Sequence, residues 1–270
     1  MTYWLVYYVF GYRKAVVLRN LQNAFPRKTM AERQQLAKQY FKHLSELIWE
    51  TVALMTISAK RQKQRLQLEH IDIVRQLYDQ KKIVFIAWGH YGNWEVVNIF
   101  HDLVPYFCMP IYKPLSSRGV DDLMYFIRSR HGAKPVKMRD SLKEFLAVYR
   151  KKEHFLGGFI TDQTPTGNEI NFWTTFLNQE TPVFLGMEKL AKKMGAAVVF
   201  MDMKKQGFLK YKLVFHLIAE NATQTEPYEI TLKHTKLLED EINEAPAYWL
   251  WSHRRWKHKR KKGEPVWPKL

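Results

Sequence analysis

The segment of residues 88–95, Trp-Gly-His-Tyr-Gly-Asn-Trp-Glu, holds the side chains best suited to chemistry, with His90 and Glu95 five positions apart. Gly89 and Gly92 let the backbone turn sharply and leave room for a substrate. An imidazole can accept a proton near neutral pH, and a neighbouring carboxylate fixes its tautomer and stabilises the imidazolium. We therefore interpret His90 as a general base for a hydroxyl, oriented by Glu95. Such catalysis contributes on the order of 10² to 10⁴ in rate.

The same spacing recurs at His234 and Glu239, inside a segment with helical periodicity. Two positions five apart point in different directions from a helix, so we expect this pair to lie on the surface. His90 instead follows the apolar run 83–88, which is typical of a strand buried on both faces. Open α/β sheets place ligands at the carboxyl ends of their strands, which favours His90. The alternative, that His90 only caps a turn, stays open.

Several other kinds of site have no motif in this chain. There is no G-x-S-x-G elbow, no phosphate-binding G-x-x-x-x-G-K-[ST] or G-x-G-x-x-G loop, and no H-E-x-x-H pair. The single cysteine, Cys108, lies in an apolar run and is interpreted as a buried hydrophobe. With no enzyme nucleophile in evidence, the simplest mechanism is direct attack by an acceptor hydroxyl, with no metal and no cofactor.

The elements that must position His90 alternate along the chain. Apolar runs predict strands at 83–88, 107–112, 133–136, 155–161, 196–203 and 211–218. Helical periodicity predicts helices at 94–101, 121–130, 141–150 with Ser141 as N-cap, 182–194 and 230–243. Upstream, Thr29 and Glu32 form a capping-box pattern that begins a long helix, and a basic helix is expected over 58–69.

This alternation predicts an α/β fold with a mixed, largely parallel central sheet flanked by helices. Residues 1–70 form a helical lead-in that could lie at a membrane interface, and residues 71–270 form the α/β domain. No internal repeat or low-complexity linker divides the chain, so we expect one structural domain.

The formal net charge of +17 predicts an anionic partner: nucleic acid, anionic lipid or an acidic carrier protein. The basic segment 253–262 lies among Trp249, Trp251, Trp256 and Trp267, which favours a membrane surface. The apolar run 3–10 is shorter than the about 18 residues of a spanning helix, so it could lie in the interface or be the remnant of a longer anchor. The apolar runs 83–88 and 155–160 lack interleaved basic residues, which argues against nucleic acid.

Residues 90–95 resemble the H-[FY]-G-N-W-E motif of the bacterial lipid A late (secondary) acyltransferases, which belong to the wider glycerolipid acyltransferases with H-x4-D/E. Further blocks occur in the same order as in that family. They are 11–14 followed by 20–26, then 111–114, 157–163 and 248–257.

The resemblance implies a glycerolipid-acyltransferase-like fold and transfer of a fatty acyl chain from acyl carrier protein, or coenzyme A, to a hydroxyl of a lipid A precursor. It implies a place on the cytoplasmic face of the bacterial inner membrane, peripheral or shallowly anchored. His90 and Glu95 would be the catalytic pair. The candidate substrate-binding residues are Tyr91, Asn93, Lys113, Asp162, Gln163 and Arg130. Candidate contacts for acidic partners are Arg128, Arg130, Lys134, Lys137 and Arg139.

The chain also departs from the family pattern. Lys113 stands where the family usually has Arg, which keeps the charge but loses the bidentate fork. The segments 164–171 and 176–182 differ, and the apolar N-terminal segment is shorter. A lysophospholipid or amino-lipid acceptor therefore stays an alternative, as does a non-catalytic membrane scaffold. Asp162 could instead cap the loop that follows it.

Overall fold

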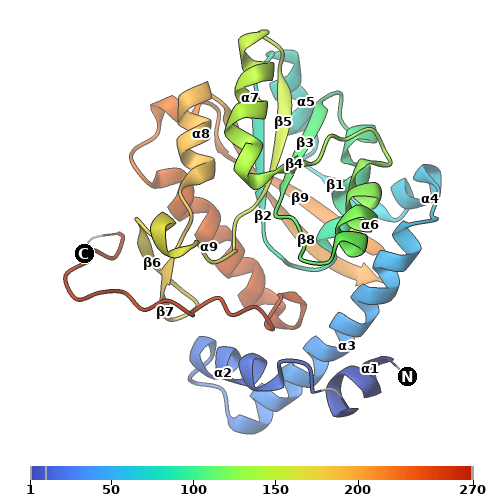
Figure 1. Ribbon diagram of the computed structural model, residues 1–270, viewed down its shortest axis with the longest axis vertical. Helices are drawn as coiled ribbons and strands as arrows, with labels where there is room; N and C mark the ends of the chain where they lie inside the picture. The colour runs from blue at the N-terminus through green and yellow to red at the C-terminus, as the bar shows by residue number, and fades with distance from the viewer. Residues whose placement is uncertain (1, 10, 269–270) are drawn as a thin grey trace.

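The structure is a computed structural model that describes residues 2–9 and 11–268. A central sheet of seven strands, in the order β1-β9-β8-β2-β5-β3-β4, lies between layers of helices (Figure 1). Its strands are β1 (Leu66–Glu69), β2 (Val84–Trp88), β3 (Phe107–Tyr112), β4 (Val136–Lys137), β5 (Phe155–Ile160), β8 (Ala197–Gly207) and β9 (Lys210–Ala219). A separate hairpin consists of β6 (Trp173–Phe176) and β7 (Gln179–Pro182).

The helices fall into an N-terminal group and a group that flanks the sheet. The first group is α1 (Thr2–Trp4), the π-helical η1 (Leu5–Val9), α2 (Lys14–Ala24), α3 (Met30–Leu54) and α4 (Ala59–Lys63). The second is α5 (Asp72–Asp79), the 3-10 helix η2 (Trp94–Asp102), α6 (Arg118–Ser129), η3 (Met138–Asp140), α7 (Ser141–Arg150), η4 (Gly167–Glu169), α8 (Gly186–Met194), η5 (Ala222–Gln224), α9 (Glu229–Glu244) and η6 (Pro246–Tyr248).

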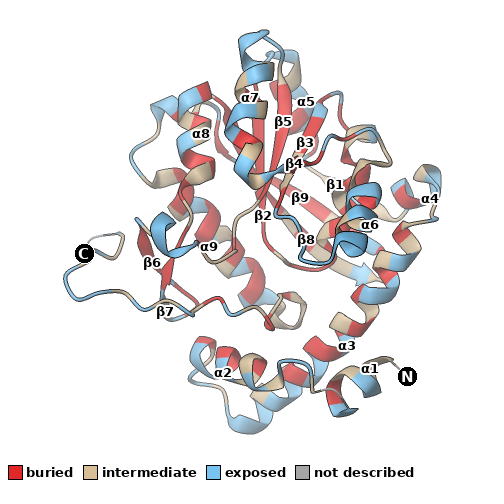
Figure 2. Ribbon diagram, in the orientation of Figure 1, coloured by how far each residue is buried: buried red, intermediate tan, exposed pale blue. Residues whose placement is uncertain are grey.

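The predicted fold class is confirmed. All neighbouring strands of the large sheet run parallel except β8 and β9, which are antiparallel. β2 is central and every one of its residues is buried, as its unbroken apolar sequence predicts (Figure 2). Cys108 is buried on β3, and burial raises the pKa of its thiol to about 12, which confirms the interpretation of a packed hydrophobe.

The N-terminal group and the sheet share one hydrophobic core, which runs from Tyr7 to Trp251. The capping box at Thr29 is formed, with Glu32 accepting from the Thr29 backbone at 2.6 Å. None of the described helices is long and apolar enough to cross a membrane. Of the apolar run 3–10, residue 10 lies outside the described residues.

Two local predictions are wrong. The expected helix over 58–69 ends at Lys63, and β1 follows, because Leu66 and Leu68 pack on the core as part of an edge strand parallel to β9. Ser141 is the first residue of α7 rather than its N-cap, and its hydroxyl donates to the Met138 carbonyl at 2.8 Å.

The β6–β7 hairpin was not predicted, and its last residue, Pro182, lies where a helix was expected to begin. The helix in this region, α8, begins at Gly186 instead. Strands of only four residues give little period-two signal, so the sequence pattern did not reveal the hairpin. Loop residues 177 and 178 connect the two strands and both have positive φ values.

Two expectations about exposure are also wrong. Trp249 and Trp251 are buried in the core rather than at a membrane surface, because the chain after α9 folds back across the molecule and places both indoles inside. His234 is 1% exposed, since α9 turns this face toward the sheet, whereas its partner in spacing, Glu239, accepts from the Leu177 backbone N–H at 2.5 Å.

Candidate active site

The candidate active site begins where two parallel strands end together. β2 and β5 are neighbours, and their register places Trp88 beside Ile160. His90 and Asp162 each follow two residues after these positions. Parallel strands present their carboxyl ends at the same edge of a sheet, so the register brings the two side chains together although they are 72 residues apart in sequence.

His90 is paired with Asp162 by direct contact. The ring Nδ1 lies 2.6 Å from Asp162 Oδ1, and the His90 backbone N–H donates to Oδ2 at 2.9 Å. The indole Nε1 of Trp249 donates to the same Oδ2 at 2.7 Å. Burial alone would raise the pKa of Asp162, but the charge of His90 and the hydrogen bonds from His90 and Trp249 outweigh it and hold this pKa well below its usual range.

This arrangement defines the tautomer of His90. An ionised Asp162 has no proton to give, so Nδ1 must carry the hydrogen and donate it. The lone pair of a neutral ring is then on Nε2. Gln163 Nε2 lies 3.5 Å from that atom, and both residues line a large cavity.

The expected contact between Glu95 and His90 is not formed, and this part of the prediction is wrong. Glu95 Oε2 accepts from Arg128 Nε at 2.9 Å, and Oε1 accepts from Arg128 Nη2 at 2.5 Å and from Trp94 Nε1 at 3.1 Å. Asn93 Oδ1 accepts from the Glu95 backbone N–H and so begins η2. Because η2 starts directly after the turn, Glu95 points toward α6 and forms a buried, bidentate ion pair there.

The cavity beside His90 has a volume of about 1070 Å³. Its wall is formed largely by apolar side chains of β2, β3, β5, α8 and the segment before α8, including Ile86, Pro110, Leu156, Phe159, Phe184 and Met187. Polar and charged groups are fewer, among them Lys113, Arg128, Gln163 and Thr164. An apolar space with a small number of polar groups near a histidine can hold a long aliphatic chain with its reactive end at the base.

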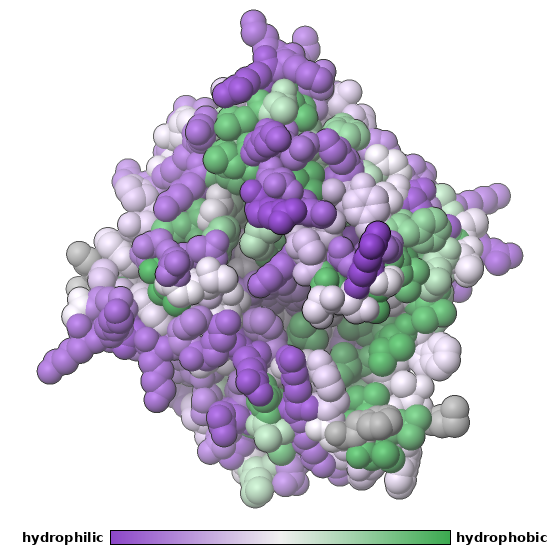
Figure 3. Space-filling model, in the orientation of Figure 1, coloured by the Kyte–Doolittle hydropathy of each residue, from purple (hydrophilic) through white to green (hydrophobic). Residues whose placement is uncertain are grey.

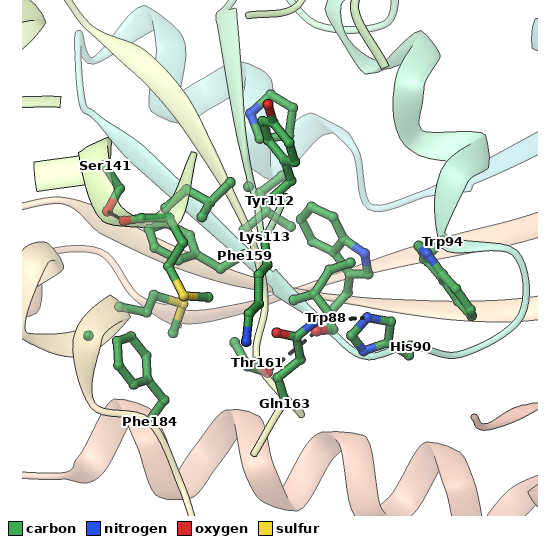
Figure 4. Close-up of a pocket in the computed structure, with 18 of the residues that line it drawn as sticks. Trp88, His90, Trp94, Tyr112, Lys113, Ser141, Phe159, Thr161, Gln163 and Phe184 are labelled. Atoms are coloured by element: carbon green, nitrogen blue, oxygen red, sulfur yellow. Dashed lines mark hydrogen bonds between the residues drawn. The ribbon is translucent and has the colours of Figure 1, made fainter. Parts of the chain in front are cut away.

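Two of the predicted substrate-binding residues extend into this cavity close to His90. Figure 4 shows Lys113 and Gln163 directed toward the same part of the cavity as the His90 ring, together with Thr161. Lys113 follows β3, whereas Thr161 and Gln163 follow β5. The ends of the neighbouring strands β2, β5 and β3 therefore bring these polar groups together. Their separation along the chain does not indicate that they are close in space.

The four other predicted substrate-binding residues do not line the cavity. Asp162 instead accepts from the ring and the backbone of His90. The Tyr91 hydroxyl donates to the Ala245 carbonyl at 2.8 Å, and burial, followed by nearby carboxylates, raises the pKa of Tyr91. Asn93 is fully buried and donates to Glu50 at 3.0 Å. Arg130 donates to the backbone carbonyls of Leu54 and Ile57, which joins the end of α6 to the end of α3. Each of these side chains has a structural partner instead of a substrate-facing surface.

Sequence reasoning missed the part that the C-terminal block plays in this site. Trp249 holds Asp162, and the Leu250 backbone N–H donates to the His90 carbonyl at 3.0 Å. Thr164 donates to the Arg255 carbonyl at 2.9 Å, so the loop after Asp162 is tied to the same block. The ordered block at 248–257 was visible in the sequence, but its position beside β2 and β5 was not.

His253 lies close to this group as a second, uncharged imidazole. Its Nε2 is 3.2 Å from the Thr164 hydroxyl. Burial, only partly opposed by the charge of Asp162, lowers the pKa of His253 to about 4. Within the described residues, no group of three or more His, Cys, Asp or Glu side chains is placed to hold a metal ion.

The chain is similar in sequence to a family of known proteins. The family model for bacterial lipid A biosynthesis acyltransferases matches residues 3–258. A lipid A biosynthesis palmitoleoyltransferase of Escherichia coli K12 is 23% identical over 252 residues, which cover 91% of this chain and 79% of that protein. A lipid A biosynthesis acyltransferase of Shigella flexneri matches with the same identity and coverage. One of Haemophilus influenzae is 23% identical over 233 residues, covering 86% of this chain and 72% of that protein.

The family match defines the class of protein as an acyltransferase. With a match across nearly its whole length, the chain belongs to the bacterial lipid A biosynthesis acyltransferase family.

Proposed function

We propose that this protein transfers a fatty acyl chain from a thioester donor, acyl carrier protein or coenzyme A, to a hydroxyl of a lipid A precursor. The observation that carries this proposal is the His90–Asp162 pair. With its Nδ1 hydrogen directed to Asp162, His90 has its lone pair on Nε2, at a large and mainly apolar cavity. Membership of the family and the names of its relatives support the acceptor.

In the proposed reaction, His90 Nε2 removes the proton from the acceptor hydroxyl as that oxygen attacks the thioester carbonyl carbon. Asp162 stabilises the imidazolium that forms, through the hydrogen bond from Nδ1. The carbon–sulfur bond of the tetrahedral intermediate then breaks, and the thiolate takes the proton back from Nε2. The products are an ester and a free thiol, and no acyl-enzyme is formed.

The negative charge that develops on the carbonyl oxygen needs donors nearby. Lys113 and Gln163 extend toward His90 from neighbouring strand ends, so we assign them this role. Lys113 carries the charge that the family usually supplies with Arg, but as a single ammonium group. Glu95 contributes by holding Arg128 at the cavity wall, where a guanidinium can bind an anionic part of either substrate.

The charge of the chain fits both proposed substrates. Acyl carrier proteins are acidic and lipid A precursors carry phosphates, so a net charge of +17 accelerates association with each of them. Arg139 lines the cavity, is exposed and lies 3.5 Å from Asp140, whereas Lys134 does not line the cavity and contacts Glu144 at 2.6 Å. Arg139 is therefore the better candidate for a contact with an anionic substrate.

We further propose that the protein works peripherally at the cytoplasmic face of the inner membrane. Exposed apolar side chains form what we call the apolar band, which comprises Trp4, Leu5, Tyr8 and Val9, then Ile48, Trp49 and Val52 of α3, and Val120, Leu123 and Phe126 of α6. Figure 3 shows apolar surface along this side of the molecule, from the level of α6 down to α1. Exposed aromatic and aliphatic groups of this kind suit the interface of a bilayer.

Contacts between the helices support the continuity of the apolar band. Trp49 Nε1 donates to the Thr2 hydroxyl at 2.9 Å, which joins α3 to α1. Arg130 joins the end of α6 to Leu54 and Ile57 at the end of α3. Val120 of the apolar band also lines the cavity, so a lipid acceptor would have a short path from the bilayer to His90.

The test of the proposed function is an acyl-transfer assay with labelled acyl carrier protein, supplied with either a lipid A precursor or a lysophospholipid. Label should appear on the lipid A precursor, and His90→Ala should lower the rate by about 10² to 10⁴ because the general base is removed. His154→Ala is the control, since this histidine packs against Tyr78 and Tyr106 outside the cavity. Undiminished transfer by His90→Ala would refute the mechanism, and label only on the lysophospholipid would refute the acceptor.

A further inference from the structure

Glu50 of α3 is a fully buried carboxylate beside the turn that follows β2. Both of its oxygens are occupied. Oε1 accepts from Lys205 Nζ and from the Leu209 backbone N–H, each at 2.9 Å. Oε2 accepts from the Tyr211 hydroxyl at 2.7 Å and from Asn93 Nδ2 at 3.0 Å. Four donors therefore satisfy one buried carboxylate and offset the cost of burying it.

The hydrogen bond from Asn93 connects Glu50 to the turn that carries His90. The amide nitrogen of Asn93 donates to Glu50, and the amide oxygen, Oδ1, accepts from the Glu95 backbone N–H at 3.1 Å. Glu50 can only accept, so it fixes which way the Asn93 amide points and keeps Oδ1 available for η2. The start of η2, and with it the end of the turn, therefore depends on a residue of α3.

A second connection reaches the same turn through His43, also on α3. Burial and the nearby charge of Lys205 lower the pKa of His43 to about 4, so the ring is neutral at neutral pH. Its Nε2 lies 3.2 Å from the Gly92 carbonyl, which can only accept, so Nε2 carries the hydrogen. Nδ1 is then free to accept from Lys205 Nζ at 3.4 Å.

Lys205 of β8 thus contacts both side chains that hold the turn. Its ammonium lies within hydrogen-bond reach of Glu50 and His43, and Glu46 Oε2 is 3.0 Å away. The turn itself includes Gly92 at a φ of +56°, where an added Cβ would lie 2.8 Å from the Met203 sulfur. The backbone there is both unusual in conformation and closely surrounded.

We propose that Glu50, His43 and Lys205 are positioning residues for the reaction, which act through Asn93 and Gly92 to fix the backbone that carries His90. This inference rests on the proposed function of His90. A general base must meet its hydroxyl within hydrogen-bond reach, and a displacement of about 1 Å can cost about 10² in rate. The N-terminal helix α3 is in this way a part of the catalytic apparatus, although none of its side chains lines the cavity.

The test compares two buried carboxylates, Glu50 and Glu188. Glu188 accepts from Tyr228 N, Thr231 N and the Thr231 hydroxyl, and it does not contact the turn. In Glu50→Gln, an amide NH₂ would face donors, so we expect kcat to fall by about ten- to a hundredfold with KM changed by less than about twofold. Both variants should lower the melting temperature by similar amounts, because each alters a buried, hydrogen-bonded carboxylate. Glu188→Gln should leave kcat unchanged.

A milder pair of variants covers the case in which Glu50→Gln does not fold. Tyr211→Phe removes one of the four hydrogen bonds to Glu50, and Tyr106→Phe removes a buried hydroxyl that donates to the Lys82 carbonyl instead. We expect a severalfold lower kcat for Tyr211→Phe only. Equal kcat values within each pair would overturn the inference. Loss of activity in His90→Ala alongside such a result would leave the proposed function standing.

Discussion

At the scale of single residues, two buried carboxylates near His90 have different partners. Asp162 accepts from the ring of His90, from its backbone and from Trp249, so its charge acts directly on the imidazole. Glu95 is neutralised by a bidentate contact with Arg128. An ion pair already formed has little field left for a third group, whereas Asp162 can stabilise the imidazolium of the proposed reaction.

This difference predicts unequal effects of two isosteric changes. Asp162→Asn should lower kcat by about 10³ to 10⁴, because an amide does not stabilise the imidazolium and can favour the other tautomer. Glu95→Gln should cost less, since it weakens the hold on Arg128 and leaves the His90 ring in place. Single-turnover rates of the two variants at neutral pH measure the contrast. A larger loss in Glu95→Gln would restore Glu95 as the orienting residue and remove Asp162 from that role.

At the scale of elements, α3 has two functional faces. One face carries His43 and Glu50, which bind the turn after β2. Another face exposes Ile48, Trp49 and Val52 as part of the apolar band. The helix therefore lies between the proposed membrane surface and the catalytic turn, while its buried apolar residues, such as Tyr40 and Phe41, belong to the shared core.

The apolar band predicts which helices bind lipid. Trp49→Ser and Phe126→Ser should weaken binding to vesicles of phosphatidylglycerol and phosphatidylethanolamine severalfold, because each removes an exposed large apolar side chain from the interface. Tyr149→Ser is the matched control, since Tyr149 is similarly exposed on α7, away from α1, α3 and α6 (Figure 1). Vesicle sedimentation at fixed salt measures the effect. Equal loss in all three variants would count against the band as the docking surface.

At the scale of the whole molecule, folding keeps several histidines neutral. Burial lowers the pKa of His43 and of His253 to about 4, and that of His234 to about 3. In the unfolded chain these groups have their ordinary pKa of about 6.5. Their contribution to stability is therefore fully present above about pH 6.5 and is lost as the pH falls toward the folded values, because only the unfolded chain then binds the protons.

His234 isolates this effect, because its Nδ1 is buried without a hydrogen-bond partner among the described residues. His234→Leu has a similar volume and should have nearly the stability of the parent at pH 7. At pH 5 the parent should lose about 2 kcal/mol through protonation of this histidine in the unfolded chain, and the variant should not. Urea denaturation at the two pH values measures the difference. An unchanged pH dependence would contradict the assignment, and His70→Asn, at an exposed site, provides the control.

The candidate site was only partly predictable from sequence. His90 was identified by its position after a buried strand, and Asp162 and Gln163 by their block in the chain. The predicted pairing of His90 with Glu95 is wrong because a spacing of five residues does not by itself bring two side chains into contact, and η2 turns Glu95 toward Arg128. The basic residues that follow Trp249 predict a surface position for it. Local composition does not reveal that the chain folds back into the core at this point.

The sequence by itself determined the class of fold, the buried central strand, the capped long helix and the histidine at the end of a strand. These depend on local periodicity and on hydrogen bonds within a few residues, which the order of amino acids contains directly. Only the tertiary structure decided which carboxylate meets His90, which tryptophans are buried and which helix holds the turn. Those outcomes depend on strand order and register, which join segments 72 to 231 residues apart, and no local pattern encodes such pairings.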